Sequence, residues 1–427
     1  MFTLRRRWTL LLAALLLAGC AAPGPQTGAP RWLAAWGSAQ LDQPPAAPGS
    51  PAVPPPWQAP LTDVSLRQVV RTTVAGDLLR VRISNLFGLQ PLQLGAASVA
   101  RVAAGSTAGD PQLEASSLRP LRFQGRRELT LAPGAEAWSD PVPLALPPLA
   151  DLAVQMHLTQ SPARATVHPG SRIQSWALAG NQVDRAEWPN ALPRDGWWHL
   201  AAVDVQATAA QPVLVAIGDS ITDGYGVAAG SYRRWTDALA RRLVAEGRAA
   251  AVVNTGIGGN RLLRDGLGPR VLDRFGRDVL ERSGVTHAVL LAGVNDLGVS
   301  HRQRATTPAS RAALLAELKA GLATLAAQAR ARGVCLAVGT VMPYGGSGYY
   351  QHQPENEADR QALNDWIRRE AGFDAVVDFD ALTRDPARPS HLRPEFDNDG
   401  LHPSMAGYQA MADAFPLALL ERRCPAR

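Results

Sequence analysis

The feature that most restricts the fold of this chain is a change of hydrophobic rhythm near Pro212. From there on, short apolar runs such as 213–217 and 287–293 alternate with longer amphipathic runs such as 231–247. Strands that alternate with helices are typical of a parallel sheet covered on both faces. We therefore expect a flavodoxin-like three-layer α/β/α sandwich with five strands over residues 209–427.

Residues 31–208 show a different pattern, with short strand-like runs separated by turn residues. The run 78–84 alternates apolar and polar residues, which is the period of a half-buried strand. Together with the strand-like run 65–74 and the turn at 75–77, it predicts an antiparallel hairpin. No convincing amphipathic helix interrupts this part, so it predicts a separate all-β domain of jelly-roll-like sandwich type.

The first residues have the layout of an export signal, with Arg5–Arg7 followed by an apolar stretch and small residues. The ending Leu17–Cys20 resembles a bacterial lipobox, which implies cleavage before Cys20 and lipid attachment to its thiol. We expect a signal peptide at 1–19, a Pro/Gly-rich lipidated tether at 20–30, and an exported bacterial lipoprotein anchored to the membrane and facing the periplasm or the cell surface. An uncleaved anchor and a plain signal peptide are the alternatives.

Charge and cysteine content narrow the range of partners. The net charge is +6, and the arginines are scattered among acids rather than gathered in a stripe. Such a distribution is only weak evidence for nucleic-acid binding, so we expect no nucleic acid as a partner. Of three cysteines, Cys335 and Cys424 lie outside the leader, and they either pair or stay as buried thiols. The eight histidines show no metal-ligand spacing, so we expect neither a metal nor a cofactor.

A candidate nucleophile follows the first strand of the α/β part, where the apolar run 213–217 stops at Gly218-Asp219-Ser220. Serine needs a base to take its proton, and the best base is a histidine held by a carboxylate. Asp399 and His402 stand three residues apart on a Gly-containing turn near the C-terminus, so they can bond to each other. The alternative is an ordinary turn at Ser220 together with a turn acid and a surface histidine.

Donors for an oxyanion are expected at neighbouring strand ends. The backbone N–H of Ser220, the Gly258-Gly259 loop after the second strand, and the Asn295 side chain after the third could supply them. In a flavodoxin-like sheet the first and third strands flank the switch point, where sites form. We therefore expect Ser220 and Asn295 to face each other there.

Four blocks in this order, Gly218-Asp219-Ser220, Gly259, Gly293-x-Asn295-Asp296 and Asp399-x-x-His402, resemble those of the SGNH (GDSL) hydrolase family. The resemblance covers about residues 212–421. It implies that Ser220 is the nucleophile, His402 the general base and acid, and Asp399 the residue that orients His402. It further implies an oxyanion hole made by the Ser220 N–H, the Gly259 N–H and the Asn295 side chain.

The N-terminal part resembles a multidomain branch of this family, sometimes found with xylan-degrading enzymes, in the stretches 32–40, 79–88 and 197–205. We expect a serine esterase for short acyl groups, acetyl above all, on a polysaccharide. A lipid or lysophospholipid esterase, a polysaccharide O-acetyltransferase with the same triad, and a carbohydrate-binding module on an inactive hydrolase are the alternatives. Tyr344, in the loop 342–350, is the candidate substrate-binding residue.

The remaining polar and aromatic residues near these blocks have structural interpretations. We expect Asp219 and Asp296 to bond loop amides, and Asp223 to be a turn acid. His168 is expected to bond within the sandwich. Trp197-Trp198 could offer a platform for a sugar ring, but adjacent strand residues point to opposite faces, so at most one of them can do so, and we expect core packing.

Overall fold

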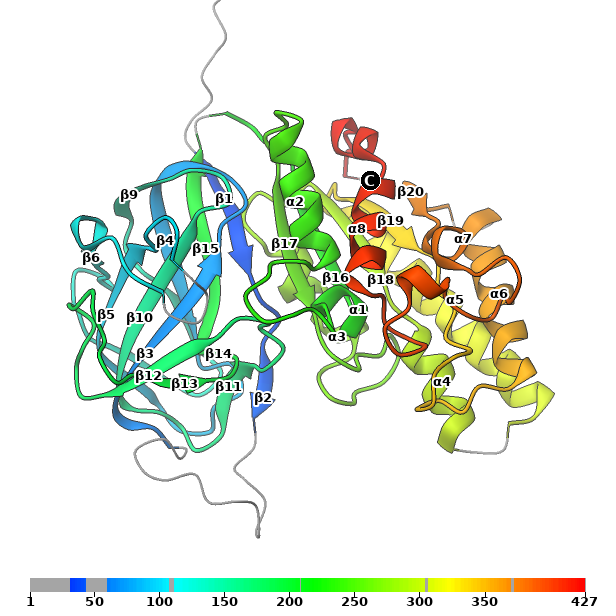
Figure 1. Cartoon of the computed structure of the whole chain (residues 1–427), viewed down its shortest axis with the longest axis horizontal. Helices are drawn as coiled ribbons and strands as arrows, with labels where there is room; N and C mark the ends of the chain where they lie inside the picture. Colours follow the sequence, from blue (N-terminus) through cyan, green and yellow to red (C-terminus); the bar gives the residue numbers. More distant parts are fainter. Residues whose placement is uncertain are drawn as a thin grey trace, which may run out of the picture.

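The computed structural model describes residues 31–43, 60–106, 111–207, 209–303, 306–369 and 372–426. The expected signal peptide, Cys20 and the tether lie outside these residues. The chain folds into an antiparallel β half and an α/β half that lie side by side (Figure 1).

Two antiparallel sheets and a small third one make up the N-terminal half. A five-stranded sheet contains β1 (Arg31–Gly37), β15 (Leu200–Ala207), β4 (Gly76–Ser84), β8 (Glu136–Trp138) and β9 (Val142–Leu146). A seven-stranded sheet contains β13 (Leu192–Arg194), β12 (Ser175–Ala179), β3 (Thr62–Arg71), β10 (Asp151–Gln160), β5 (Leu92–Arg101), β6 (Arg119–Pro120) and β7 (Leu129–Leu131). The third sheet is β14 (Trp197–Trp198), β11 (Ala165–His168) and β2 (Leu41–Gln43).

The predicted hairpin over residues 65–84 is wrong. β3 pairs with β10 and β12 in the seven-stranded sheet, whereas β4 pairs with β15, β8 and β9 in the other sheet. The turn between them therefore carries the chain from one sheet to the next. The alternation in β4 is real, since Leu79, Val81 and Ile83 are fully buried. It predicts a strand with one buried face and does not identify the strand with which it pairs.

The C-terminal half contains a five-stranded parallel sheet, as expected. Its order is β17-β16-β18-β19-β20, in which the first strand of the half lies between the second and the third. The strands are β16 (Val213–Gly218), β17 (Ala251–Gly256), β18 (His287–Leu291), β19 (Cys335–Gly339) and β20 (Ala375–Val377). This is the flavodoxin-like order, so the predicted fold class is confirmed and the switch point lies between β16 and β18.

Eight α-helices of the described residues pack around this sheet (Figure 1). They are α1 (Ser220–Asp223), α2 (Trp235–Ala245), α3 (Val271–Phe275), α4 (Val294–Gln303), α5 (Pro308–Ala331), α6 (Pro354–Arg369), α7 (Phe379–Thr383) and α8 (Met405–Ala414). The described residues also form four short helical segments, Ala115–Ser117 in the β half and Gly276–Leu280, Pro394–Phe396 and Leu417–Glu421 in the α/β half. α2 packs on α8, and α5 packs on α3 and α6.

The two halves share one continuous apolar core and a hydrogen-bonded interface. β1 packs along β17, and Thr73 exchanges hydrogen bonds with the backbone of Val252, with its Oγ1 3.0 Å from the N–H and 3.2 Å from the carbonyl. The buried Arg282 donates to the carbonyl oxygens of Ser38 at 2.8 Å and Ala201 at 3.2 Å. Because these bonds replace water on buried polar groups, the interface is specific and not merely a contact of surfaces.

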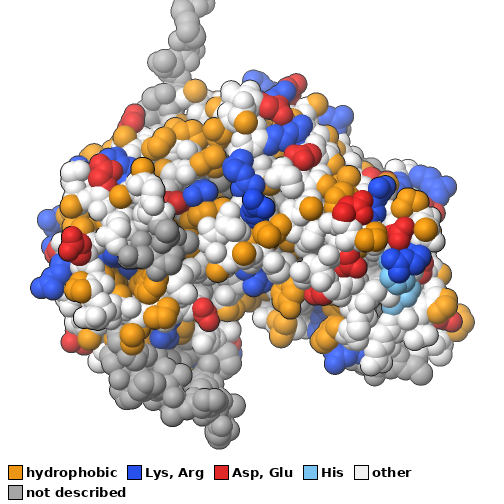
Figure 2. Space-filling model, in the orientation of Figure 1, with side chains coloured by type: hydrophobic (Ala, Val, Ile, Leu, Met, Phe, Trp, Pro, Cys, Tyr) orange, Lys and Arg blue, Asp and Glu red, His pale blue; other side chains and the backbone are white. Residues whose placement is uncertain are grey.

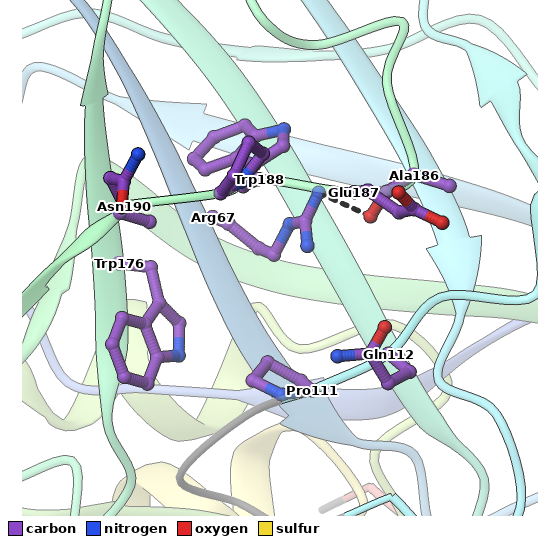
Figure 3. A pocket seen from close by; sticks show the side chains of 10 residues that line it. Arg67, Pro111, Gln112, Trp176, Ala186, Glu187, Trp188 and Asn190 are labelled. Atoms are coloured by element: carbon purple, nitrogen blue, oxygen red, sulfur yellow. Dashed lines mark hydrogen bonds between the residues drawn. The ribbon is translucent and has the colours of Figure 1, made fainter.

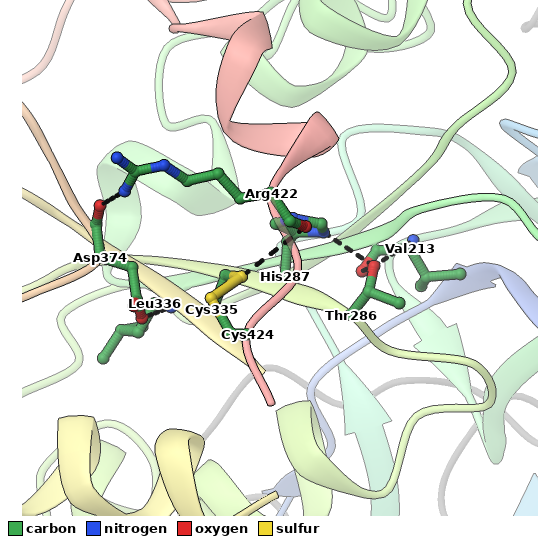
Figure 4. The surroundings of a disulfide bond; sticks show 8 residues. All are labelled: Val213, Thr286, His287, Cys335, Leu336, Asp374, Arg422 and Cys424. Atoms are coloured by element: carbon green, nitrogen blue, oxygen red, sulfur yellow. Dashed lines mark hydrogen bonds between the residues drawn. A yellow bond between two sulfur atoms is a disulfide. The ribbon is translucent and has the colours of Figure 1, made fainter. Parts of the chain in front are cut away.

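A disulfide joins Cys335, at the start of β19, to Cys424 near the C-terminus (Figure 4). It settles the alternative left open by the sequence in favour of pairing. The Cα atoms are 5.3 Å apart, and the bond closes a loop with a sequence separation of 89 residues. The tail beyond α8 is thereby attached to the central sheet.

Three further features of the described residues concern surface charge, membranes and metals. Figure 2 shows positive and negative side chains interspersed on the visible face, with no single basic patch. Among the helices formed by the described residues, none is long and apolar enough to cross a membrane. The same residues contain no cluster of three or more His, Cys, Asp or Glu side chains that could hold a metal ion.

Candidate active site

Ser220 is the first residue of α1, directly after β16. Asp219 caps this helix, since its carboxylate accepts a hydrogen bond from the N–H of Ile221 at 3.0 Å. A buried strand thus ends at the first turn of a helix, where backbone N–H groups have no partner within the helix. Ser220 is 6% exposed, and its hydroxyl lies at the carboxyl edge of the sheet.

The structure joins Ser220, His402 and Asp399 in one hydrogen-bonded chain. Ser220 Oγ lies 2.8 Å from His402 Nε2, and His402 Nδ1 lies 2.8 Å from Asp399 Oδ2. A proton on Nδ1 that is donated to Asp399 leaves Nε2 free to accept from the serine hydroxyl. Ser220 and His402 are 182 residues apart in sequence.

The turn that carries Asp399 and His402 has a fixed shape. Asp399 Oδ1 accepts from the backbone N–H groups of His402 at 2.8 Å and Leu401 at 3.1 Å. Gly400 between them has φ +80°, and a Cβ there would lie 2.1 Å from the carbonyl carbon of Gly346. Only glycine fits this position, so the backbone itself aims the carboxylate at the imidazole.

The ionisation of the pair favours a neutral base. Burial lowers the pKa of His402 below 6.5 and outweighs the hydrogen bond and charge of Asp399, which raise it; the positive charge of Arg172 lowers it further. Burial alone would raise the pKa of Asp399, but hydrogen bonds from the N–H and the imidazole of His402 bring it below 3.8. The carboxylate is therefore charged and the imidazole neutral near pH 7.

The three predicted oxyanion donors follow adjacent strands of the sheet. Ser220 follows β16, Gly259 follows β17, and Asn295 lies in the first turn of α4 after β18. No hydrogen bond from the Gly259 N–H is found within the described part of the chain. One N–H of the Asn295 amide donates to the carbonyl oxygen of Asn260 at 2.7 Å, which leaves the second N–H available.

The loop 342–350 meets this site through a different tyrosine from the one predicted. Tyr344 is fully buried and packs edge-on against Tyr350, with ring centroids 5.9 Å apart. It presents no surface to a substrate, so its predicted role is not supported. Tyr350, which the sequence reasoning missed, donates its hydroxyl to Asn295 Oδ1 and so orients the Asn295 amide.

The predicted structural roles hold for two of the acids. Asp219 caps α1, and Asp296 accepts from the N–H groups of Leu262 at 2.8 Å and Leu263 at 3.0 Å. Burial raises the pKa of Asp219 to about 7 and that of Asp296 to about 6.

The expectation for Asp223 is wrong and that for His168 holds only in part, because His168 bonds within the β half through one ring nitrogen and binds Asp223 across the halves through the other. His168 Nε2 lies 2.9 Å from Asp223 Oδ1, and its Nδ1 lies 2.8 Å from the carbonyl oxygen of Ala39. Both side chains are buried. Asp223 is the last residue of α1, so the β half contacts the helix that begins with Ser220.

A buried arginine that the sequence reasoning also missed connects the strand ends. Arg274 donates to the carbonyl oxygens of Gly218 at 2.9 Å and Thr255 at 2.6 Å, and to Asn260 Oδ1 at 2.9 Å. Asp278 balances its charge at 3.0 Å. Arg274 thus holds β16, β17 and the Gly259 loop in register, and it has no access to a substrate.

The N-terminal half has a pocket of its own, of about 430 Å³ (Figure 3). Its walls include Trp176 and Trp188, and Arg67 lies 4.4 Å from the centre of the Trp188 ring. Arg67 donates to the carbonyl oxygen of Ala186 at 2.8 Å, which holds the loop over the sheet. None of the predicted site residues lines this pocket. Trp197 and Trp198 are buried, as expected.

Comparisons with known proteins bear on the C-terminal half. A GDSL-like lipase from Bacteroides thetaiotaomicron is 21% identical over 50% of this chain and 92% of its own, with a TM-score of 0.37. The lipase/acylhydrolase from Enterococcus faecalis is 24% identical over 51% of this chain and 100% of its own, with a TM-score of 0.37. The acetylxylan esterase Axe2 from Geobacillus stearothermophilus is 23% identical over 50% of this chain and 96% of its own, with a TM-score of 0.35. Comparison with curated proteins gave no match.

The sequence pattern of the GDSL-like lipase/acylhydrolase family matches residues 216–410. That range contains the hydrogen-bonded chain from Ser220 to Asp399, the Gly259 loop and Asn295. The C-terminal half of this chain is therefore a GDSL-like lipase/acylhydrolase domain of the SGNH family, and the protein is a carboxylic ester hydrolase.

Proposed function

We propose that the protein is a serine esterase that removes short acyl groups, acetyl above all, from a polysaccharide through an acyl-enzyme. The observation that carries the proposal is the hydrogen-bonded chain from Ser220 Oγ through His402 to Asp399, with both donor–acceptor distances at 2.8 Å. A serine in this setting has a neutral base within reach, and the base has a carboxylate that fixes its tautomer.

The reaction begins when Ser220 Oγ attacks the ester carbonyl and its proton moves to His402 Nε2. The imidazolium that forms is stabilised by the Asp399 carboxylate. Collapse of the tetrahedral intermediate breaks the bond to the alcohol oxygen, which takes the proton from Nε2. Water then attacks the acyl-serine, again with His402 as base, and releases the acid and the free serine.

The negative oxygen of both tetrahedral intermediates needs fixed donors. The Ser220 N–H, the Gly259 N–H and the second N–H of Asn295 are the proposed set. Tyr350 supports this role of Asn295, because a bond to Oδ1 keeps the amide nitrogen turned away from the tyrosine. These donors come from neighbouring strand ends, so the acyl group would lie across the switch point.

A short acyl group is favoured by the small size of the groups around the serine. Glycine, asparagine and serine offer little apolar area, and each buried methylene contributes about 0.8 kcal/mol only where a surface receives it. One apolar side chain stands against this. Leu267 is 76% exposed and would lie 2.6 Å from a Cβ at Gly259, and it favours the second candidate, a lipid esterase.

Two measurements test the proposal. Ser220→Ala should lose at least about a thousandfold in kcat on p-nitrophenyl acetate with its fold intact by circular dichroism. In a chain-length series of p-nitrophenyl esters, kcat/KM should be highest at acetate and fall at least about tenfold by octanoate, since extra methylenes stay in water. Turnover by pure Ser220→Ala protein would refute the nucleophile, and a preference for octanoate would select the lipid esterase.

We further propose that Cys20 carries a lipid that anchors the protein outside the cytoplasm. The motif Leu17–Cys20 and the arginines before it support this proposal. Wild-type protein should partition into detergent with membranes, whereas Cys20→Ser should be released or should accumulate unprocessed. Recovery of the wild type wholly in the aqueous fraction would contradict the anchor.

A further inference from the structure

The loop after β11 reaches from the β half onto the catalytic half. It begins at His168, which bonds Asp223 at 2.9 Å, and continues through Gly170, where a Cβ would lie 2.1 Å from Asp223 Oδ2. Arg234, just before α2, donates to the carbonyl oxygen of Ser171 and, at 2.9 Å, to that of Asp223. The loop is thereby held on α1 at two successive points, and its next residue is Arg172.

Arg172 has an unusual backbone and a side chain without hydrogen bonds to other described residues. Its φ is +54°, a left-handed conformation that non-glycine residues rarely adopt and that often occurs at functional sites. Its Nε is buried without a hydrogen-bond partner, and no side-chain hydrogen bond of Arg172 is found within the described part of the chain. The nearest carboxylate oxygen, Asp223 Oδ2, is 3.9 Å away, beyond hydrogen-bond distance.

A buried donor without a partner is costly, because it has lost water and gained nothing, and in Arg172 this holds for Nε. The Arg172 side chain is only 26% exposed. Asp223 gives partial charge balance, but its other oxygen is engaged by His168. The buried Nε is therefore a cost that the fold does not offset, and the two terminal nitrogens, which are not among the buried unpartnered atoms, stay accessible to a ligand.

Arg172 lies beside the proposed catalytic base, which suggests a role for its side chain. Its Cζ lies 5.5 Å from the centre of the Tyr225 ring, and that ring stacks on the imidazole of His402 with centroids 4.1 Å apart. Tyr225 is 45% exposed, so this pair faces solvent beside the proposed base. The charge of Arg172 is close enough to lower the pKa of His402.

His402 donates its proton to the leaving alcohol, so groups beside its ring meet the alcohol part of the ester and not the acyl part. A guanidinium presents several N–H donors in a planar fork that matches a carboxylate. Resting on the function proposed above, we propose that Arg172 and Tyr225 form a subsite that binds a carboxylate on the alcohol part of the substrate, as on an acidic sugar. The β half would then select the substrate of the catalytic half.

A matched pair of esters tests this subsite: 3-acetoxybenzoate, whose leaving group carries a carboxylate, and 3-acetoxybenzamide, its neutral counterpart. The wild type should favour the carboxylate by at least about fivefold in kcat/KM at low salt, mainly through KM. Arg172→Gln should bring the ratio to one or below, and Arg172→Lys should retain part of it. Arg126→Gln, at an exposed arginine of the same half, should keep the wild-type ratio.

The ratio separates binding of the carboxylate from support of the fold, because a purely structural loss lowers both rates equally. A wild-type ratio of one, or an unchanged ratio in Arg172→Gln, would overturn the subsite. Calorimetry with 3-acetoxybenzoate and the inactive Ser220→Ala protein, with and without Arg172→Gln, measures binding without turnover. If the wild type cleaves neither ester, the proposed function fails, and the calorimetry still decides the subsite: weaker binding with Arg172→Gln supports it, and equal binding refutes it.

Discussion

Replacing Asp399 by asparagine separates the two roles of this side chain, which are to fix the turn and to orient His402. Oδ1 holds the turn by accepting from the backbone N–H groups of His402 at 2.8 Å and Leu401 at 3.1 Å, and Oδ2 faces His402 Nδ1 at 2.8 Å. In Asp399→Asn the amide oxygen can keep the backbone bonds, which puts the NH₂ group opposite Nδ1. Two donors cannot face each other, so the imidazole must carry its proton on Nε2.

In that tautomer His402 can no longer accept the proton of Ser220. A buried aspartate replaced in this way in a serine protease costs about 10⁴ in kcat. The Asp399 side chain is 37% exposed, so water can partly replace its charge. We therefore expect a loss of about 10³–10⁴, which corresponds to about 4–5.5 kcal/mol in the barrier.

The assay measures kcat on p-nitrophenyl acetate at pH 7.5, and thermal unfolding of the same protein is followed in parallel. The melting temperature should stay within about 3 °C of the wild type, because the turn keeps its backbone bonds. Asp399→Ala is the control that removes both the backbone bonds and the bond to His402. It should lose activity and also destabilise the turn. A loss in Asp399→Asn smaller than tenfold, or about 1.4 kcal/mol, would refute the role given to Asp399.

Two further predictions concern pH and redox state. Activity requires neutral His402, whose pKa is lowered by burial, so kcat/KM should rise with pH and reach half its maximum below pH 6.5. Because Arg172 also lowers this pKa, Arg172→Gln should move the half-maximal pH upward, and a downward shift would contradict the placement of its charge. The Cys335–Cys424 bond closes a loop with a sequence separation of 89, which should stabilise the fold by about 4–5 kcal/mol. Urea unfolding of the wild type, with and without a reductant, and of Cys335→Ser measures this contribution. A difference in the free energy of unfolding below about 1 kcal/mol would show that attaching the tail adds little stability.

The parts of the structure that could be predicted from the sequence are those with a local cause. The α/β half has an apolar run for each strand and an amphipathic run for α2, α3, α5, α6 and α8, which predicts the alternation of strands and helices and the three layers. No amphipathic run predicted α1, α4 or α7. Ser220, Asn295 and His402 each stand in a short motif beside a strand end or helix start, and the fold brings the strand ends to one edge. The helix-like run 404–423 forms α8 and a separate short helical segment, because Pro416 lacks the N–H that would continue α8.

The wrong predictions have a common physical origin in contacts between distant segments. The period of β4 shows which face is buried, but two sheets offer such a face, and the sequence does not choose between them. Tyr344 and Tyr350 stand in the same loop and both rings are buried, and only the path of the loop brings the hydroxyl of Tyr350 to Asn295. The disulfide likewise depends on how the tail returns to β19.

The contacts of His168 and Arg172 show why a family pattern that begins at residue 216 describes only part of this site. His168 lies 55 residues before Asp223 and shares no local motif with it, yet the two are bonded and buried at the end of the nucleophile helix. In an isolated catalytic half Asp223 would lose this partner, and the Tyr225 ring on His402 would lose its neighbouring cation. A catalytic half expressed alone from residue 209 should therefore be less stable and should have lost any preference for the carboxylate ester. If it kept both the stability and the ester preference of the full chain, the β half would be a passive attachment and the subsite would have to lie elsewhere.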